Sequence, residues 1–305
     1  MDFKIKDFTI EKFNNDVNNS GDLDKKYFQW QEYRNKISGY ISHAIKGKKL
    51  SSILVMGAGE CNDIDLSFLV SNFSEITLCD IDIKSIDEGI RRQKIADDMI
   101  TKITKVKADF TGLDDIGFFE ELSELTSKKT SQAEISEYIS DAIKSIKIDG
   151  TLPDYSNKYD AVLVLPTYTQ LAYTQMETLL RILYQYNIYP IEHLNKMLTA
   201  MHYAMPKIIK NYNELILSIL KSKGHLFVLS DILEITDEKV LSDISGELDN
   251  KEYIMKALEK NCSEFGMMGL DDLKARIETM NTQYEVWPFD DERKFLVEFL
   301  QGTKL

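Results

Sequence analysis

The feature that most constrains the fold of this chain is a run of apolar residues followed directly by a glycine turn. Ile53 to Met56 are apolar, and Gly57-Ala58-Gly59 follows them at once. A second strand-like stretch, residues 75–80, ends at Asp80, about 20 positions after the turn. A buried strand, a glycine turn and an acidic residue closing the next strand form the pattern with which α/β folds bind ribose hydroxyls. The sequence therefore predicts a pocket for a nucleoside-containing cofactor.

Strand-like and helix-like segments alternate along most of the chain. Buried strands are expected at residues 52–57, 75–80, 103–109, 159–165 and 225–230. The apolar periodicity predicts helices between them, among others at residues 24–46, 62–73 and 83–100, and Asn62 or Asp63 is the expected cap of the second. This alternation is typical of a doubly wound, mostly parallel sheet.

The C-terminal part departs from this alternation. Helices are expected between residues 237 and 280, and strands at 284–289 and 294–300 flank a short turn, which predicts an antiparallel hairpin. The expected fold class is therefore α/β: a doubly wound, seven-stranded, mostly parallel sheet with a C-terminal antiparallel hairpin, plus N-terminal and inserted helices.

The chain divides into a short N-terminal part and one large domain. Residues 1–48 are expected to form a polar arm and a helix, and residues 49–305 the α/β domain. Helical insertions are expected at about 114–150 and 170–222, because both stretches are longer than a single crossover requires.

Composition and charge narrow the possible partners. The formal net charge of −13 makes nucleic acid an unlikely partner and favours a small-molecule substrate. The three cysteines lack paired spacing, so neither disulfides nor a structural zinc is expected, and a cytoplasmic location follows from that usage. The isolated histidines and carboxylates predict no metal site, no apolar run is long enough for a membrane span, and a monomer or homodimer is expected.

The segment from Val55 to Cys61 resembles the glycine motif of the class I S-adenosylmethionine-dependent methyltransferases, roughly acidic-x-G-x-G-x-G. Gly57 and Gly59 match two of its glycines, whereas Val55 and Cys61 replace the usual acid and a frequent glycine. Asp80 matches the family's ribose-binding acid. The resemblance covers about residues 25–305 and implies a Rossmann-like methyltransferase domain.

The resemblance also implies which residues bind S-adenosylmethionine. Asp109 and Phe110 match the pair that brackets the adenine, and Leu165-Pro166 lies at the end of strand four, where the family places its substrate-facing motif. The implied cofactor-binding residues are Gly57, Ala58, Gly59, Asp80, Ile81, Asp109, Phe110, Leu165 and Pro166. The glycine turn is expected to let backbone amides approach the ligand.

The expected reaction is methyl transfer to a small-molecule acceptor by in-line displacement, for which an enzyme mainly supplies alignment. Thr167 and Tyr168 are the candidate catalytic residues, since they follow strand four. An equally weighted alternative makes this segment a strand-to-helix turn with Thr167 or Thr169 as the cap. Trp30 is expected either in a lid over the cofactor or, more often, in the packed face of the first helix.

Three other functions remain open on the sequence. An aminoalkyl transferase would use the same sheet, and a non-catalytic nucleoside-binding module would explain the departures at Val55 and Asn62. A nicotinamide dinucleotide is the weakest of the three, because Asn62 stands where the dinucleotide fingerprint has its third glycine.

Overall fold

A computed structural model describes residues 23–146 and 152–305, so the arm predicted for residues 1–22 lies outside the described residues. Its centre is a sheet of seven strands in the order β3-β2-β1-β4-β5-β7-β6. The strands are β1 (Ser52–Met56), β2 (Glu75–Asp80), β3 (Ile103–Lys107), β4 (Tyr159–Val164), β5 (Leu220–Ile235), β6 (Ile277–Trp287) and β7 (Lys294–Lys304).

The pairing of the strands confirms the predicted fold class. Strands β1 to β5 pair in parallel, and β7 lies antiparallel between β5 and β6. This is the seven-stranded sheet with a closing hairpin that the resemblance to class I methyltransferases implies. Because β1 lies between β2 and β4, the strand order reverses there, and ligands of open α/β sheets bind at the carboxyl edge of that point.

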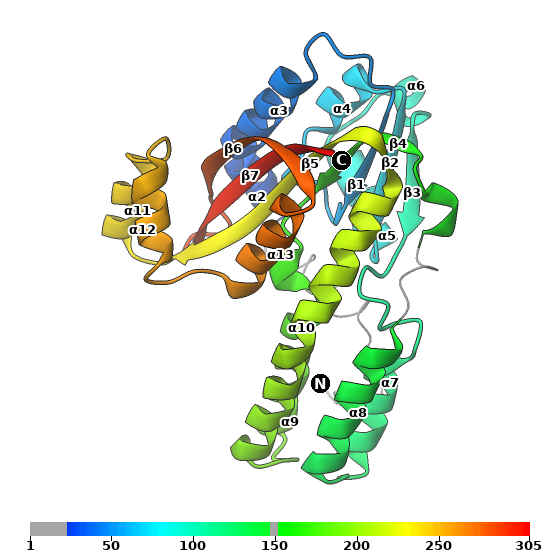
Figure 1. Cartoon of the computed structure of the whole chain (residues 1–305), viewed down its shortest axis with the longest axis vertical. Helices are drawn as coiled ribbons and strands as arrows, with labels where there is room; N and C mark the ends of the chain where they lie inside the picture. The colour runs from blue at the N-terminus through cyan, green and yellow to red at the C-terminus, as the bar shows by residue number, and fades with distance from the viewer. Residues whose placement is uncertain (1–22, 147–151) are drawn as a thin grey trace.

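Helices cover both faces of the sheet (Figure 1). They are α2 (Leu23–Gln29), α3 (Gln31–Ile45), α4 (Leu66–Asn72), α5 (Ile83–Arg92), α6 (Asp97–Ile100), α7 (Phe118–Ser127), α8 (Gln132–Ser145), α9 (Tyr173–Gln185), α10 (Ile191–Ile219), α11 (Glu238–Ser245), α12 (Lys251–Leu258) and α13 (Glu264–Lys274), with 3-10 turns η2 (Pro153–Tyr155) and η3 (Tyr168–Gln170). Alternate residues of β1 face opposite layers: Ile53 and Val55 pack with α3 to α5, whereas Leu54 and Met56 pack with α8, α10 and α13.

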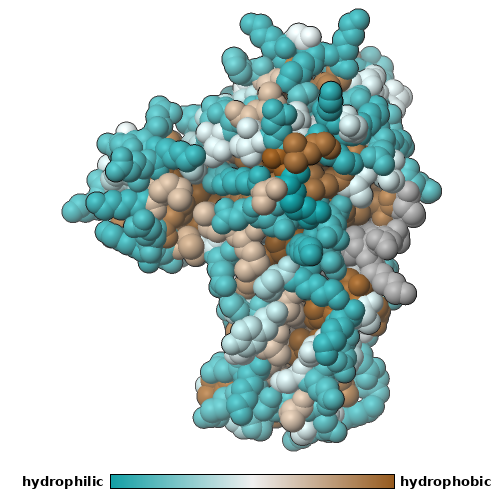
Figure 2. Space-filling model, in the orientation of Figure 1, coloured by the Kyte–Doolittle hydropathy of each residue, from teal (hydrophilic) through white to brown (hydrophobic). Residues whose placement is uncertain are grey.

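The two expected insertions come together in space. Helices α7 and α8 pack beside α9 and the first half of α10, and the four form a projection away from the sheet (Figure 1). A smaller pair, α11 and α12, projects elsewhere, and the visible tips of both projections are mostly hydrophilic (Figure 2). The sequence predicts the helices but not that segments so far apart share one core.

Several predicted boundaries are wrong, and the helix after the glycine turn is the most important. Helix α4 begins at Leu66 rather than at residue 62, and its cap is Asp65, which accepts from Phe68 N at 3.0 Å. The intervening residues form a loop because Gln93 Nε2 donates to the carbonyls of Cys61 and Ile64, at 2.6 and 3.0 Å. The glycine turn therefore opens into a loop and not into a helix N-terminus.

Other boundaries shift by less. The first predicted helix is divided at Trp30 into α2 and α3, and the helix predicted at 83–100 stops at Arg92, shortly before Lys94 takes a φ of 51°. Strand β5 is longer than expected, and β6 begins at Ile277, inside the stretch predicted to be helical. No helix among residues 23–146 and 152–305 is both long and apolar enough to cross a bilayer.

Candidate functional site

A hollow at the carboxyl edge of the sheet brings the predicted cofactor residues together. It encloses about 1030 Å³, counting its open mouth. All nine residues implied by the resemblance line it, and so does Thr167. The remaining lining residues are Lys26, Trp30, Glu60, Cys61, Asn62, Asp63, Ala108, Thr111, Gln170, Leu171, Gln175, Trp287 and Phe289.

The glycine turn does not offer its amides to a ligand, contrary to the prediction. Gly57 N and Ala58 N both donate to Cys79 O at 3.0 Å, and Gly59 N donates to Asp80 Oδ2 at 2.8 Å. What the glycines provide is a close approach of the backbone. A Cβ on Gly57, whose φ is 75°, would stand 2.2 Å from the methyl carbon of Thr167, whereas one on Gly59 would meet nothing within 4 Å.

Asp80 links the turn to the end of β2. Besides its bond from Gly59 N, its Oδ1 accepts from Asp82 N at 2.9 Å. Burial raises the pKa of Asp80 to about 6, although these two amides favour the ionised form. Each carboxylate oxygen can accept more than one hydrogen bond, so Asp80 retains capacity for hydroxyl donors of a ligand.

Asp109 holds its own loop. Its Oδ1 accepts from Thr111 N and Thr111 Oγ1, at 2.8 and 2.6 Å, and its Oδ2 accepts from Asp114 N at 2.9 Å. The carboxylate of Asp109 therefore shapes the loop after β3. Phe110 lines the hollow beside it, with its ring centroid 5.4 Å from that of Tyr212.

Two further carboxyl groups stand at the turn, so the site is strongly acidic. Burial raises the pKa of Glu60 to about 7, against the opposing charges of Lys26 and Arg92. Burial likewise raises the pKa of Asp63 to about 7, although Arg34 lowers it. The ionised forms are short of compensating charge, and a cationic ligand would supply it.

The segment after β4 corrects one catalytic candidate. Thr167 lines the hollow and its Oγ1 lies 3.0 Å from the hydroxyl of Tyr212. Tyr168 is fully buried, does not line the hollow, and donates to Asn213 Oδ1 at 2.6 Å. Tyr168 therefore fixes the segment against α10 and is not placed to act on a substrate.

The capping alternative for this segment holds for the position of Thr167 but not for a side-chain cap. Thr167 stands at the N-cap position of the 3-10 turn η3, but its side chain makes no capping bond, and α9 begins after Ala172, also without a side-chain cap. Thr169 Oγ1 instead donates to Asp231 Oδ2 at 2.7 Å. We call residues 167–171 the strand-4 loop. It is bonded to α9 at two points, because its carbonyls at Thr169 and Gln170 accept from side chains of that helix.

An aromatic wall that the sequence does not predict closes the hollow on one side. Trp30, Trp287 and Phe289 pack with centroid separations of 4.9 to 5.9 Å, and Trp30 Nε1 donates to Phe289 O at 3.2 Å. Trp30 is thus both packed and part of the pocket, whereas Tyr33 stacks on Trp287 outside the lining. No local pattern links residue 30 to residues 287–289, because only the tertiary fold joins them.

Three of the nine buried side-chain polar atoms without a partner among the described residues belong to the lining. Glu60 Oε1, Gln175 Oε1 and Trp287 Nε1 are buried and have no hydrogen-bond partner among the described residues. Buried polar groups are nearly always satisfied, so three such atoms around one hollow indicate a place for a ligand or for ordered water. Across the described part of the chain, no group of histidine, cysteine and acidic residues has the arrangement of a metal site.

Comparison with known proteins finds similarity in structure alone. No protein-family model and no curated protein matches the chain. The N-methyltransferase NodS from Bradyrhizobium japonicum WM9, in complex with S-adenosyl-L-homocysteine, is 9% identical with a TM-score of 0.43, covering 97% of this chain and 99% of its own. A SAM dependent methyltransferase from Aquifex aeolicus is 10% identical with a TM-score of 0.44, covering 98% and 100%. The [4+2]-cyclase SpnF is 10% identical with a TM-score of 0.44, covering 90% and 83%. Similarity at this level does not assign an activity, so the function must be argued from the site.

Proposed function

We propose that the hollow binds S-adenosylmethionine and that the protein transfers its methyl group to a small-molecule acceptor. The glycine turn is the main support. A pyrophosphate needs free backbone amides, usually at a helix N-terminus. Here the amides of residues 57–59 already donate within the protein, no helix starts until Leu66, and Glu60, Asp63 and Asp80 surround the turn. These features oppose a dinucleotide and favour a nucleoside cofactor that has positive charge and no phosphate.

The residues of the hollow match the parts of such a cofactor. Asp80 retains lone pairs for ribose hydroxyls, and the side chains of Ile81 and Phe110 are apolar surfaces for the base. Glu60 Oε1 lacks a partner among the described residues and suits the ammonium of the methionine part. Glu60 would thereby supply the acid that the family's motif has at the position of Val55. When bound, the sulfonium supplies an electrophilic methyl group.

The chain's own contribution to transfer is alignment. The strand-4 loop places Thr167 and Gln170 in the lining, opposite the end of β2. Thr167 is held by Tyr212 and Thr169 by Asp231, so the acceptor side of the hollow is preorganised. A fixed geometry of this kind lowers the entropic cost of bringing nucleophile and methyl carbon into line.

Isothermal titration calorimetry with S-adenosylhomocysteine tests the cofactor. We expect binding to the wild-type protein, a loss of at least about tenfold in affinity in Asp80→Ala, and no binding of NAD at the same concentrations. Glu88→Ala, an exposed carboxylate on α5, is the control and should bind normally. Tighter binding of NAD, no heat with S-adenosylhomocysteine at several hundred micromolar, or binding that Asp80→Ala leaves unaffected each contradicts the proposal. Binding without turnover on any acceptor would favour the non-catalytic module.

A further inference from the structure

The indole N–H of Trp287 is a buried donor without an acceptor, on a residue that lines the hollow. Trp287 is the last residue of β6 and is 4% exposed, and its Nε1 has no hydrogen-bond partner among the described residues. Trp30 beside it shows the ordinary case, because its Nε1 donates to Phe289 O at 3.2 Å. An indole nitrogen can only donate, so the partner that Trp287 lacks is an acceptor atom.

Ring contacts on several sides hold the indole of Trp287 in place. It packs edge-on against Trp30 and Phe289, with ring centroids 4.9 and 5.0 Å away, and it stacks on Tyr33 at 6.0 Å. The ring of Phe295 lies 5.8 Å from it. The indole is too closely packed to turn toward another acceptor, so the acceptor has to be brought to it.

The order of the strands places Trp287 away from the surfaces proposed for the base. Ile81 and Phe110 follow β2 and β3, at one end of the sheet, whereas Trp287 ends β6, the edge strand at the other end. The glycine turn after β1 and the strand-4 loop line the hollow between them. A cofactor with its base on Ile81 and Phe110 and its ribose at Asp80 therefore directs its amino-acid part toward Trp287.

The amino-acid part of S-adenosylmethionine offers one acceptor group. Its ammonium has donors only, and its sulfonium carries positive charge, so neither can accept from Trp287 Nε1. The carboxylate can, and a hydrogen bond to a charged acceptor is stronger than one to a neutral acceptor.

Lys26 supplies positive charge on the same side of the hollow. It is the only cationic side chain among the described residues of the lining, and Trp30 N donates to its carbonyl at 3.0 Å, so it lies one helical turn before Trp30. Burial raises the pKa of Glu60, and the charge of Lys26 opposes that rise, which shows that the two side chains interact. A base and an acid side by side complement the adjoining carboxylate and ammonium of an amino acid.

We propose that Trp287 Nε1 and Lys26 bind the carboxylate of the cofactor's amino-acid part, and that they make the hollow selective for S-adenosylmethionine over its decarboxylated form. The inference rests on the proposed function, because it assigns a further part of that cofactor. Neither residue is among the nine that the resemblance to class I methyltransferases implies. The selectivity bears on the reaction, since the decarboxylated form is the donor for aminoalkyl transfer.

The test compares two ligands that differ by one carboxylate. The protein is titrated calorimetrically with S-adenosylhomocysteine and with S-adenosyl-3-thiopropylamine, which is the same molecule without its carboxylate. We expect S-adenosylhomocysteine to bind at least about tenfold more tightly. The comparison is demanding, because Glu60, Asp63 and Asp80 attract the additional net positive charge of the decarboxylated ligand.

Variants assign the preference to its residues. Trp287→Phe keeps a ring but removes the N–H, and Lys26→Met removes the charge; each should weaken S-adenosylhomocysteine about tenfold and leave the decarboxylated ligand no weaker. Lys25→Met is the matched control and should leave both affinities unchanged, because Lys25 lies outside the lining and pairs with Asp291 at the surface. Trp30→Phe removes an N–H that is already bonded within the protein, so the ratio of the two affinities should not change.

The failures are distinguishable. If neither ligand binds, the proposed function fails and the carboxylate site fails with it. If both bind equally well, or the decarboxylated ligand binds more tightly, the nucleoside pocket stands and the carboxylate site is wrong. Equal weakening of both ligands by Trp287→Phe would reduce Trp287 to a structural role, and an undiminished preference in Lys26→Met would remove Lys26 from the site.

Discussion

Two aspartates at opposite edges of the same sheet differ in how many hydrogen-bond donors surround their carboxylates. Asp160 is the second residue of β4. It accepts from the backbone and hydroxyl donors of Ser51 and Ser52 at 2.8 to 3.1 Å and from Lys221 at 2.6 Å. Asp231 lies in β5, three residues after Val228, which pairs with the last residue of β4. Its carboxylate accepts from one donor, Thr169 Oγ1. Asp160 at the amino edge is therefore bonded at both oxygens, whereas Asp231 at the carboxyl edge keeps one oxygen without a partner among the described residues.

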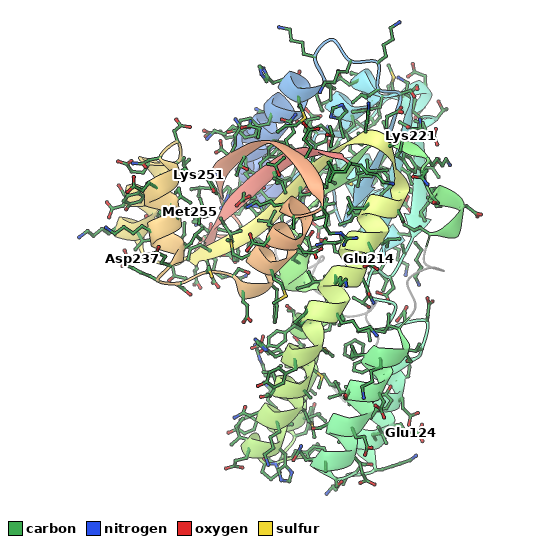
Figure 3. All side chains as sticks on the ribbon, in the orientation of Figure 1. Glu124, Glu214, Lys221, Asp237, Lys251 and Met255 are labelled. Carbon is green, nitrogen blue, oxygen red and sulfur yellow. The ribbon has the colours of Figure 1, made fainter. Side chains whose placement is uncertain are left out.

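The pKa values follow this difference. Burial alone would raise the pKa of Asp160, but Lys221 and the serine donors outweigh it and hold the pKa well below the usual range. At the other edge, burial prevails and raises the pKa of Asp231 to about 6. Lys221 is labelled where α10 passes into β5, far from the projecting helices (Figure 3). Asp160 therefore stabilises the fold, whereas Asp231 retains an acceptor that no described residue satisfies.

The largest effect is expected from Gly57→Ala, which tests whether the close approach of Gly57 to Thr167 at the carboxyl edge is needed for stability. The new Cβ would combine a left-handed φ with a close contact to Thr167, at a cost of about 4 kcal/mol in the free energy of unfolding. Gly59→Ala has the unfavourable φ but no close neighbour and should cost about 1 kcal/mol. Urea denaturation of both variants measures the difference, and equal losses would show that the contact with Thr167 is relieved without cost.

Asp160→Ala should destabilise the protein by about 2 kcal/mol at pH 7, because the donors of the buried Ser52 lose their acceptor and Lys221 loses its ion pair. A carboxyl group with a lowered pKa stabilises above its unfolded-state pKa, so the loss should shrink as the pH falls below about 4. The control is Asp141→Ala, which removes an exposed ion pair with Lys144 and should cost under about 0.5 kcal/mol.

Binding of S-adenosylhomocysteine should be unaffected by Asp160→Ala, since the two edges are separate. If the folded Asp160→Ala variant bound S-adenosylhomocysteine more weakly, the two edges of the sheet would not be independent. Denaturant unfolding across pH and calorimetry on the same sample supply both measurements.

Asp231→Asn should have an effect of similar size and opposite sign. A raised carboxyl pKa favours the folded state at low pH, and that contribution is lost as the pH rises through the folded-state value of about 6. Asparagine carries no charge at any pH, so the variant does not lose stability as the pH rises. It should therefore be more stable than wild type by about 2 to 3 kcal/mol at pH 8 and by about half as much at pH 5. Thermal melting across this range checks it, and a destabilised variant at pH 8 would show that the charge of Asp231 is compensated in the folded protein.

The sequence predicts the sheet well because strand patterns are local. The apolar runs at β1, β2 and β4 lie within a residue of the observed strands, and the glycine turn with Asp80 correctly places one wall of the hollow. The start of α4 was not predictable, because it depends on Gln93 bonding to two carbonyls about thirty residues away. The bonds that Asp109 makes within its own loop were not predictable for a similar reason, since no spacing rule reveals them.

The sequence by itself determined the order of strands and helices along the chain, the acidic character of the chain and the position of the glycine turn, because each depends on composition or short-range periodicity. Only the tertiary structure decided that Trp30 meets Trp287, that Tyr168 is buried, and that Gln175 and Asp231 present unsatisfied oxygens around one loop. Those properties arise from contacts between distant segments, and whether a polar atom finds a partner is settled only when the whole core is packed.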